Sequence, residues 1–407
     1  MIARIRPRKL RGSVAAIPSK SEAHRALICA ALADSPTEII MGEGSEDISA
    51  TIRCLTAFGA RIAPTGRGLR VEPIAEIPAS CDADCGESGS TLRFLLPVAG
   101  SLGIDARFHM RGRLPERPIA PLDRELTKGG CELTRPARDV LRITGKLRPG
   151  SYELPGDVSS QYISGLLFAF SAMEGDCALT ITGRRESADY IAMTLQALAR
   201  FGVDAKETPT GYSILAGSRL VSPGELRIGG DWSNAAFWLC AGALPGCEVR
   251  VTGLDPHSAQ GDRRVADVLH ALASGASHTL DAADIPDLVP VLAATACARG
   301  QALRVMNAGR LRIKESDRIA AVSRTLNALG GVVSETEDGL VVEPEHALQG
   351  GEVESFGDHR IAMMAAVASC ACAGEVLVRG AEAVNKSYPG FWRDFENLGG
   401  RVELTEV

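Results

Sequence analysis

Hydrophobic positions along the chain recur in a pattern longer than one helix. A helical stretch ends in Leu or Phe, three variable residues and Gly, and a strand-like run follows. The clear instances are Leu55–Gly59, Leu126–Gly130, Leu198–Gly202, Leu326–Gly330 and Phe395–Gly399, with a weaker sixth from Ala271 to Gly275. Each Gly is expected to close its helix in a left-handed conformation. Intervals of about 70 residues indicate a unit built from strands and two helices.

Six such units fit two domains of three. A chain of 407 residues is too long for one ordinary hydrophobic core. The pattern is interrupted between Leu220 and Gly230, where Pro223, Gly224 and Gly229 lie, so we expect the domains to divide there.

The composition narrows the class of protein. Apolar residues make up 45% and charged residues 23%, as in ordinary globular proteins. The net charge of −6 and the 4% aromatic content argue against a nucleic-acid partner. The eleven Cys include no CxxC pair, and the seven His do not cluster at ligand spacings, so no metal site is predicted. With neither a signal-peptide pattern nor an apolar run that could span a membrane, the chain is predicted to be cytoplasmic, without a membrane partner.

The stretch from Leu311 to Ile319 predicts a loop that runs into a helix. Lys314 and Arg318 would share one face of its first turn, where the helix dipole favours negative charge. Either Glu315 and Asp317 neutralise a solvated helix start, or an anion is held there. This stretch alone leaves both possibilities open.

A second cationic helix start follows Pro18. Ser19 to Glu22 has the pattern of a capping box, which would engage the Glu22 side chain. An anion held by Lys20, Ser21 and Arg25 therefore explains the cations better than a surface cluster does.

Five further segments put hydroxyls or cations at helix starts or in Arg-rich turns. They are Gly86–Arg93, Arg111–Pro118, Asp157–Tyr162, Phe356–Arg360 and Asn385–Pro389. If these ends converge, they form an electropositive cleft in an acidic protein. Such a cleft suits small substrates that carry several negative charges.

Eight motifs in order give the chain a family resemblance. They are Pro18–Arg25, Gly86–Arg93, Glu116–Ile119, Ser159–Gln161, Ile285–Asp287, Lys314–Arg318, Asp358–Arg360 and Lys386–Pro389. Over essentially its whole length the chain resembles the EPSP synthases (3-phosphoshikimate 1-carboxyvinyltransferases) of the enolpyruvyl transferase family. The resemblance implies an α/β fold of two similar domains. Each would have three βαβαββ-type repeats, with helices inside and sheets outside, as an inverse α/β barrel.

The resemblance also implies domain limits and a reaction. Residues 19–225 would form the shikimate-phosphate side, and residues 1–18 with 226–407 the phosphoenolpyruvate side. The enolpyruvyl group of phosphoenolpyruvate would pass to a hydroxyl of shikimate-3-phosphate with release of phosphate, in the pathway to chorismate and aromatic amino acids. We expect a monomer that needs no metal or organic cofactor.

Site residues carry over from the family where the motifs match. Contacts to shikimate-3-phosphate are implied for Lys20, Ser21, Arg25, Ser159, Ser160, Gln161, Ser187, Tyr190, Asp287 and Lys314. Contacts to phosphoenolpyruvate are implied for Lys20, Gly89, Arg117, Gln161, Arg318, Arg360 and Lys386. Asp287 is the candidate base for the attacking hydroxyl, and Glu315 and Lys20 are candidates for proton transfer at the vinyl carbon. Direct contacts from Glu87 and Arg310 stay open, because several family members have Asn at both positions.

Two other functions compete with this one. The enolpyruvyl transferase that acts on UDP-N-acetylglucosamine shares the fold, but it has Lys-Asn in place of Lys20-Ser21 and a reactive Cys in place of Gly112. A sugar-phosphate-binding protein without catalysis is the other alternative. Carboxylates such as Asp287 and Glu315 argue against it, because they would weaken anion binding unless they take part in the chemistry.

Overall fold

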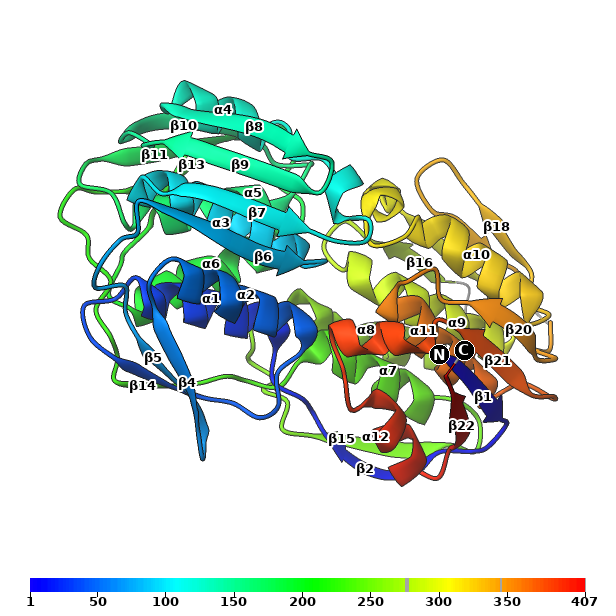
Figure 1. Cartoon of the computed structure of the whole chain (residues 1–407). Coiled ribbons are helices and arrows are strands. Elements are labelled where there is room, and N and C mark those ends of the chain that lie inside the picture. The colour runs from blue at the N-terminus through cyan, green and yellow to red at the C-terminus, as the bar shows by residue number, and fades with distance from the viewer. Residues whose placement is uncertain (275–277, 345, 407) are drawn as a thin grey trace. The chain divides into compact units, whose positions relative to one another are not determined.

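The computed structural model describes residues 1–274, 278–344 and 346–406. The chain forms two compact units, Pro18–Gly229 and Met1–Ile17 together with Gly230–Val407 (Figure 1). We call them the middle unit and the terminal unit. Within the described ranges, no helix is long and apolar enough to cross a membrane.

The middle unit contains three four-stranded sheets of one topology. In each sheet two strands pair in parallel, and two further strands extend the sheet by antiparallel pairing. The strands, in sheet order, are β14 (Glu225–Arg227), β3 (Thr37–Ile40), β5 (Gly68–Glu72) and β4 (Arg61–Thr65); β6 (Ser80–Gly86), β7 (Asp105–Met110), β9 (Val140–Gly145) and β8 (Cys131–Ala137); and β10 (Gly150–Pro155), β11 (Cys177–Thr182), β13 (Gly211–Ile214) and β12 (Lys206–Thr208).

The helices of the middle unit alternate between buried and amphipathic. They are α1 (Lys20–Ala31), α2 (Glu46–Ala57), α3 (Gly89–Leu102), α4 (Leu122–Lys128), α5 (Ser160–Phe170) and α6 (Ala188–Arg200). Almost every residue of α3 and α5 is buried, whereas α2 and α6 each keep a polar face. Strands such as β7 alternate between buried and partly exposed residues. The most apolar helices thus lie inside, and the sheets turn one face outward.

The terminal unit repeats this plan in two four-stranded sheets, but its third sheet has only two strands among the described residues, so the third repeat expected here is incomplete. Its sheets are β20 (Gly351–Glu354), β21 (Val376–Arg379), β1 (Ile2–Arg6) and β22 (Arg401–Thr405); β16 (His278–Asp281), β17 (Leu303–Met306), β19 (Leu340–Val342) and β18 (Val333–Glu335); and the pair β15 (Glu248–Thr252) and β2 (Arg11–Ala15). Its helices are α7 (Trp232–Gly242), α8 (Val265–Ala273), α9 (Val289–Arg299), α10 (Arg318–Ala328), α11 (His359–Ser369) and α12 (Phe391–Asn397). Every residue of α11 is buried, so α11 runs through the core of this unit.

Three strands complete sheets far from their own place in the sequence. β1 pairs with both β21 and β22, and β2 pairs with β15, so the N-terminal segment belongs to the terminal unit, as the family resemblance implies. Residues 1–17 thus form two strands, each paired with a different sheet of this unit. β14 returns to pair with β3, which closes the middle unit.

The repeated glycines adopt the predicted backbone conformation. Gly59, Gly130, Gly202, Gly330 and Gly399 all have positive φ angles, between 80° and 110°. A side chain would strain the backbone at these positions, which explains why the pattern ends in Gly. The sixth predicted position, Gly275, lies outside the described residues.

Candidate active site

The first helix of the middle unit begins at Lys20, as predicted. Ser19 is its N-cap, and the Ser19 hydroxyl accepts a hydrogen bond from the Glu22 amide at 3.3 Å. The other half of the predicted capping box differs. The Ser19 amide donates to the Gly229 carbonyl at 2.8 Å, and the Glu22 carboxylate accepts from the Gly229 amide at 3.0 Å. Glu22 therefore links Gly229, the last residue of the middle unit, to the start of α1.

Lys20 is paired with a carboxylate from the next helix. Its Nζ lies 2.8 Å from Asp47 Oδ2, and the Asp47 residue is buried. The Thr91 hydroxyl of α3 donates to the Asp47 carbonyl at 3.4 Å and lies 2.7 Å from the Thr51 hydroxyl of α2. These contacts gather the N-terminal ends of α1, α2 and α3.

Gln161 joins the start of α5 to α3. Its Nε2 donates to Ser90 Oγ at 2.9 Å, and its Oε1 accepts from Arg93 Nη1 at 2.9 Å. Ser159 is the N-cap of α5, and the buried Ser160 is its first residue. The hydroxyls predicted at the starts of α3 and α5 therefore lie there, whereas Ser387 ends the short helix η5 (Ala381–Lys386).

Gly89, the first residue of α3, is covered by two guanidinium groups. A Cβ at this position would lie 2.6 Å from Arg117 Nη1 and 2.9 Å from Arg93 Nη1. Arg117 follows the short helix η1 (Leu114–Glu116) in the Arg-rich turn. Two cations thus lie against a helix N-terminus, which is an arrangement that favours an anion.

The Arg25 side chain of α1 forms hydrogen bonds with α6, which the sequence did not indicate. Its three guanidinium nitrogens donate to Thr194 Oγ1 at 2.8 Å, to the Ser21 carbonyl at 2.7 Å and to the Tyr190 carbonyl at 2.8 Å. Burial lowers the pKa of Arg25 to about 10, against an opposing effect of Tyr190. Arg25 therefore anchors α6 to α1, and its contact with an anion stays a prediction. The buried Ser187 precedes α6 with a strained φ of 54°.

In the terminal unit the predicted helix start is wrong by one turn. Lys314 follows the short helix η4 (Gly309–Ile313) in an extended conformation, and α10 begins only at Arg318, capped by Asp317. Lys314 and Arg318 therefore do not share a helix face. Arg318 is 1% exposed, so the alternative of a solvated helix start is also wrong.

Three carboxylates surround the Arg318 guanidinium. Its Nη1 donates to Asp287 Oδ1 at 2.8 Å, its Nη2 to Glu315 Oε2 at 2.7 Å and its Nε to Asp358 Oδ2 at 2.8 Å. These groups come from the short helix η3 (Pro286–Leu288), from the loop before α10 and from the N-cap of α11. Burial would raise the pKa of Asp358, but the charge and the hydrogen bond of Arg318, together with His359, lower it overall.

Asp287 is shared between two arginines. Its second oxygen, Oδ2, accepts from Arg360 Nη2 at 2.8 Å, and the same nitrogen donates to Ser233 Oγ at 2.7 Å. Burial alone would raise the pKa of Asp287, but Arg360, Lys314 and Arg318 hold it well below its usual range. Burial also lowers the pKa of Lys314 to about 8, and Arg318 adds to that shift while Asp287 opposes it.

Two more cations that the sequence singles out, Lys386 and Arg310, lie in short helices of the terminal unit. The buried Lys386 is the last residue of η5 (Ala381–Lys386). Arg310 donates to the Ala283 carbonyl at 2.7 Å. The buried Asp262 was not predicted: burial raises its pKa to about 7, Asp287 adds to the rise and Arg360 opposes it.

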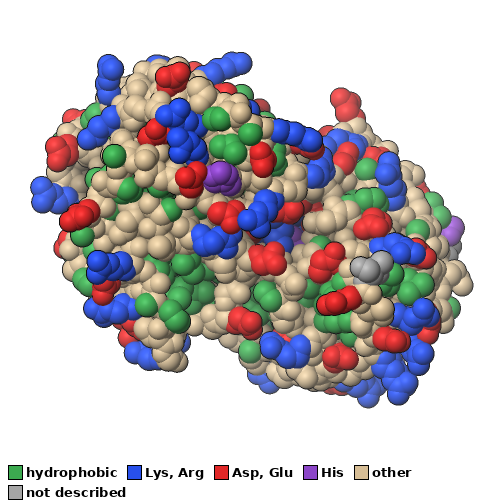
Figure 2. Space-filling model, viewed as in Figure 1, with side chains coloured by type: hydrophobic (Ala, Val, Ile, Leu, Met, Phe, Trp, Pro, Cys, Tyr) green, Lys and Arg blue, Asp and Glu red, His purple; other side chains and the backbone are tan. Residues whose placement is uncertain are grey.

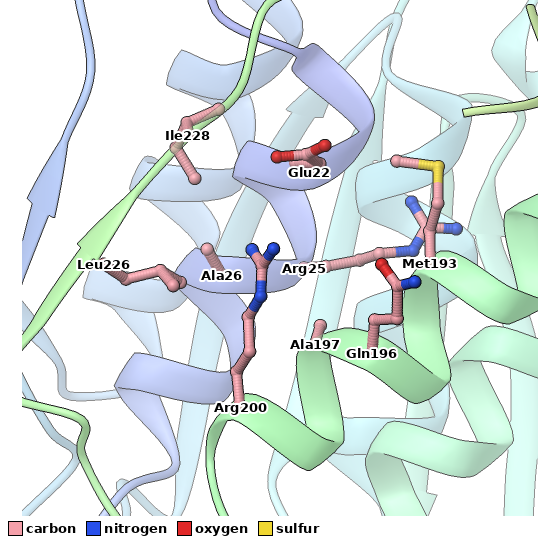
Figure 3. Close-up of a pocket in the computed structure, with 9 residues that line it drawn as sticks. All are labelled: Glu22, Arg25, Ala26, Met193, Gln196, Ala197, Arg200, Leu226 and Ile228. Carbon is pink, nitrogen blue, oxygen red and sulfur yellow. The ribbon is translucent and has the colours of Figure 1, made fainter. Parts of the chain in front are cut away.

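Two pockets of the middle unit do not fit a multiply charged substrate. The cavity in Figure 3 has a volume of about 20 Å³, enough for one water molecule, and Glu22 and Arg200 project toward the same space in it. A larger pocket of about 450 Å³ has Arg67 as its single charged lining residue, and Arg67 pairs with Glu225. On the face drawn in Figure 2, basic and acidic side chains are interspersed.

Comparisons with known proteins agree with the motifs. The family model for EPSP synthase (3-phosphoshikimate 1-carboxyvinyltransferase) matches residues 5–395. The 3-phosphoshikimate 1-carboxyvinyltransferase of Clostridium kluyveri is 40% identical over 99% of this chain and 98% of its own length. That of Clostridium beijerinckii is 39% identical over 98% and 97%. The chain belongs to the EPSP synthase family.

Solved structures place the fold in the same group. An EPSP synthase from Acinetobacter baumannii matches 100% of both chains with a TM-score of 0.80 and 25% identity. The enolpyruvyl transferase NikO from Streptomyces tendae matches 100% of this chain and 99% of its own with a TM-score of 0.75, and at 18% identity it shows the fold alone. As a member of the EPSP synthase family, the chain is an enolpyruvyl-transferring enzyme of the shikimate pathway.

Gly112 separates this EPSP synthase family member from the UDP-N-acetylglucosamine enzyme. Its φ is +54°, and a Cβ there would collide with Glu87 Oε1. A Cys at this position would be strained by the positive φ and would require Glu87 to move, which disfavours the reactive Cys that the alternative predicts. This agrees with the family assignment.

The sequence did not reveal three of the carboxylates that lie near the cations of the site, namely Asp358, Asp47 and Asp262. Asp358 lies in a motif that the sequence singles out, and its place just before an apolar helix was the signal for an N-cap. Asp47 gave no such signal, because its partner Lys20 is 27 residues away. Asp262 precedes two arginines, which favours the interpretation as a solvated turn, and only the fold buries it beside Asp287.

The raised pKa of Asp262 predicts a pH dependence of stability. In the unfolded chain this group loses its proton near pH 4, and in the folded protein it keeps it to about pH 7. Its contribution to stability is therefore present at low pH and lost as the pH rises through this window. Asn imitates the protonated form of Asp262. The free energy of unfolding of D262N should therefore rise relative to that of the wild type by about 1–4 kcal/mol as the pH increases from 4 to 8.

Urea unfolding of both proteins across this range measures that difference. D267N, which changes an exposed carboxylate in the following helix, is the matched control. Its free energy of unfolding relative to the wild type should stay constant above about pH 5. A D262N difference that is equally flat would contradict the prediction.

Proposed function

We propose that the chain transfers the enolpyruvyl group of phosphoenolpyruvate to a hydroxyl of shikimate-3-phosphate, and that the charged groups named below carry out the reaction. The observation that supports these roles best is the sharing of Asp287 between Arg318 and Arg360, with both oxygens held at 2.8 Å. A candidate base is thus paired with the cations proposed to bind the substrate anion.

This pairing gives Asp287 a role that depends on the substrate. A carboxylate with a strongly lowered pKa is a weak base. The phosphate and carboxylate of phosphoenolpyruvate would compete with Asp287 for Arg318 and Arg360. As the arginines turn to the substrate, the pKa of Asp287 rises because it loses the charges that lowered it. Asp287 would then accept the proton of the attacking hydroxyl.

The proton added to the vinyl carbon needs a separate donor. We assign this step to Glu315 or Lys20, which the sequence also nominates. Addition of the hydroxyl oxygen to the central carbon, with protonation of the terminal carbon, gives a tetrahedral intermediate. Loss of phosphate from the central carbon and of a proton from the new methyl group gives the enolpyruvyl ether. Arg117, Arg318, Arg360 and Lys386 would stabilise the departing phosphate.

Shikimate-3-phosphate would be held mainly by the middle unit. The proposed contacts are Lys20, Ser21, Arg25, Ser159, Ser160, Gln161, Ser187 and Tyr190, with Asp287 and Lys314 from the terminal unit. Support comes from the bonds that gather the starts of α1, α2, α3 and α5, because helix N-termini present backbone amides and partial positive charge to anions. Gly89 and Arg117 at the start of α3 would contribute to the phosphoenolpyruvate contacts.

We also propose that the enzyme is a cytoplasmic monomer. All eleven cysteines are free thiols, which suits a reducing compartment.

Release of inorganic phosphate tests the function directly. The enzyme should release phosphate from phosphoenolpyruvate when shikimate-3-phosphate is added, and not when UDP-N-acetylglucosamine is added instead. Release with the nucleotide sugar alone would favour the second transferase. Saturable binding of shikimate-3-phosphate without release would favour a binding protein.

D287N tests the proposed base. Its kcat should fall by about 10²–10⁴ because the hydroxyl loses its proton acceptor. Its KM for phosphoenolpyruvate should not rise, because the arginines no longer have this carboxylate as a competing partner. D284N is the control, since Asp284 is a partly exposed neighbour that pairs with Arg264, and it should keep near-normal activity. A raised KM with unchanged kcat in D287N would assign Asp287 to binding instead.

G89A tests the contact between Arg117 and the substrate. The added methyl would displace the Arg117 guanidinium, so the KM for phosphoenolpyruvate should rise about tenfold or more, with a smaller change for shikimate-3-phosphate. G66A is the matched control, because a Cβ there meets nothing within 4 Å. Equal KM values in G89A and wild type would remove Gly89 and Arg117 from the phosphoenolpyruvate contacts.

A further inference from the structure

The guanidinium group of Arg360 is held by one carboxylate and one hydroxyl. Its Nη2 donates to Asp287 Oδ2 at 2.8 Å and to Ser233 Oγ at 2.7 Å, and its Nη1 donates to the Asp287 carbonyl at 3.2 Å. Arg360 is 3% exposed, and its buried Nε has no hydrogen-bond partner among the described residues. The orientation of this guanidinium therefore depends on Asp287 and Ser233.

Arg318 and Arg360 differ in what remains when Asp287 leaves. If a substrate anion displaced the Asp287 carboxylate, Arg318 would keep Glu315 at 2.7 Å and Asp358 at 2.8 Å. Within the described part of the chain, the Arg360 guanidinium would keep the Ser233 hydroxyl and the Asp287 carbonyl. The two hydrogens of Arg360 Nη2 serve Ser233 and Asp287 separately, so an anion can replace the carboxylate without breaking the bond to Ser233.

Ser233 lies in the first turn of α7, and other side chains fix this turn. The Asp231 side chain caps the helix by accepting from the Asn234 amide at 2.8 Å. Gln260 Oε1 accepts from the Trp232 amide at 3.0 Å. The backbone on both sides of Ser233 is thus held by a buried side chain. The Ser233 hydroxyl is therefore carried by a rigid element, which is what a precise contact requires.

The same helix also holds the segment that follows Lys386. Ser387 Oγ donates to Asn234 Oδ1 at 3.2 Å. One turn further along α7, Trp238 Nε1 donates to the Tyr388 hydroxyl at 3.1 Å. The beginning of α7 is therefore a common support for two of the cations assigned to phosphoenolpyruvate.

We propose that Ser233 is a positioning residue, which keeps the Arg360 guanidinium oriented while phosphoenolpyruvate replaces Asp287. This inference rests on the proposed function, because it requires Arg360 to bind that substrate. Ser233 takes no part in the chemistry and acts through Arg360. Without the hydroxyl, the substrate itself would have to orient the guanidinium as it binds, and the ordering would reduce its affinity.

Steady-state kinetics of S233A test this role. The KM for phosphoenolpyruvate should rise about tenfold, because a hydrogen bond to a charged group is lost. The KM for shikimate-3-phosphate and the thermal midpoint of unfolding should stay near the wild-type values. S233T keeps the hydroxyl and should restore the KM for phosphoenolpyruvate to within about threefold of the wild type.

S334A is the matched control, because it removes an exposed hydroxyl from β18 of the same unit. Both of its KM values should equal those of the wild type. An unchanged KM for phosphoenolpyruvate in S233A would overturn the proposal. Equal increases in both KM values of S233A, with a lowered thermal midpoint, would show a merely structural role and would also overturn it.

R360K separates a failure of this inference from a failure of the proposed function. Lys keeps the positive charge but cannot form the paired hydrogen bonds of a guanidinium. If R360K raises the KM for phosphoenolpyruvate and S233A does not, Arg360 binds the substrate and only the positioning role of Ser233 is wrong. If neither variant raises it, the assignment of Arg360 to phosphoenolpyruvate is wrong as well.

The double variant S233A/R360K shows whether Ser233 acts through Arg360. Residues that act through one contact give a combined effect smaller than the product of the single effects. We therefore expect the KM for phosphoenolpyruvate of the double variant to lie within about twofold of that of R360K. A KM that changes by the product of the two single effects would show that Ser233 contacts the substrate by itself, and it would overturn the positioning role.

Discussion

The terminal unit depends on the burial of one guanidinium group. Arg318 is 1% exposed, and Asp287, Glu315 and Asp358 each accept from it at 2.7–2.8 Å. A buried charge without such partners would cost several kcal/mol, so the carboxylates are a condition for the arginine to be there. They come from three separate segments, and the helices α9, α10 and α11 must pack together before the charge is balanced.

The same pairing of charges would allow a substrate anion to replace Asp287 as the partner of the arginines. Asp287 bonds to both Arg318 and Arg360, so each of its oxygens occupies a position that a substrate anion could take. Replacing one anion by another keeps the buried cations neutralised at every stage. In the function proposed above, this exchange would help the site to release phosphate, because a bare cationic pocket would bind the product too tightly.

In the middle unit, polar side chains join the helix starts with fewer buried charges than in the terminal unit. Its helix starts are joined by Lys20 to Asp47, by Thr91 to the Asp47 carbonyl and by Gln161 to Ser90. Each repeat supplies one buried helix whose N-terminus carries a hydroxyl or a cation. Because the repeats have one topology, their equivalent ends meet in the same region. The repeat therefore does more than build a core, since it also gathers helix dipoles and polar side chains into one place.

The sequence by itself determined the number and kind of the repeats, their closing glycines and the residue types at the helix starts. These features follow from local rules: Gly59 and its equivalents need positive φ, and Ser19 and Ser159 cap the helices that follow them. Local rules failed at Lys314, which precedes the helix, and at Glu22, which binds Gly229. Only the tertiary structure decided which carboxylate neutralises which cation. Pairs such as Lys20 with Asp47 and Arg360 with Asp287 join distant segments, and their electrostatic energy depends on burial and distance that no local pattern contains.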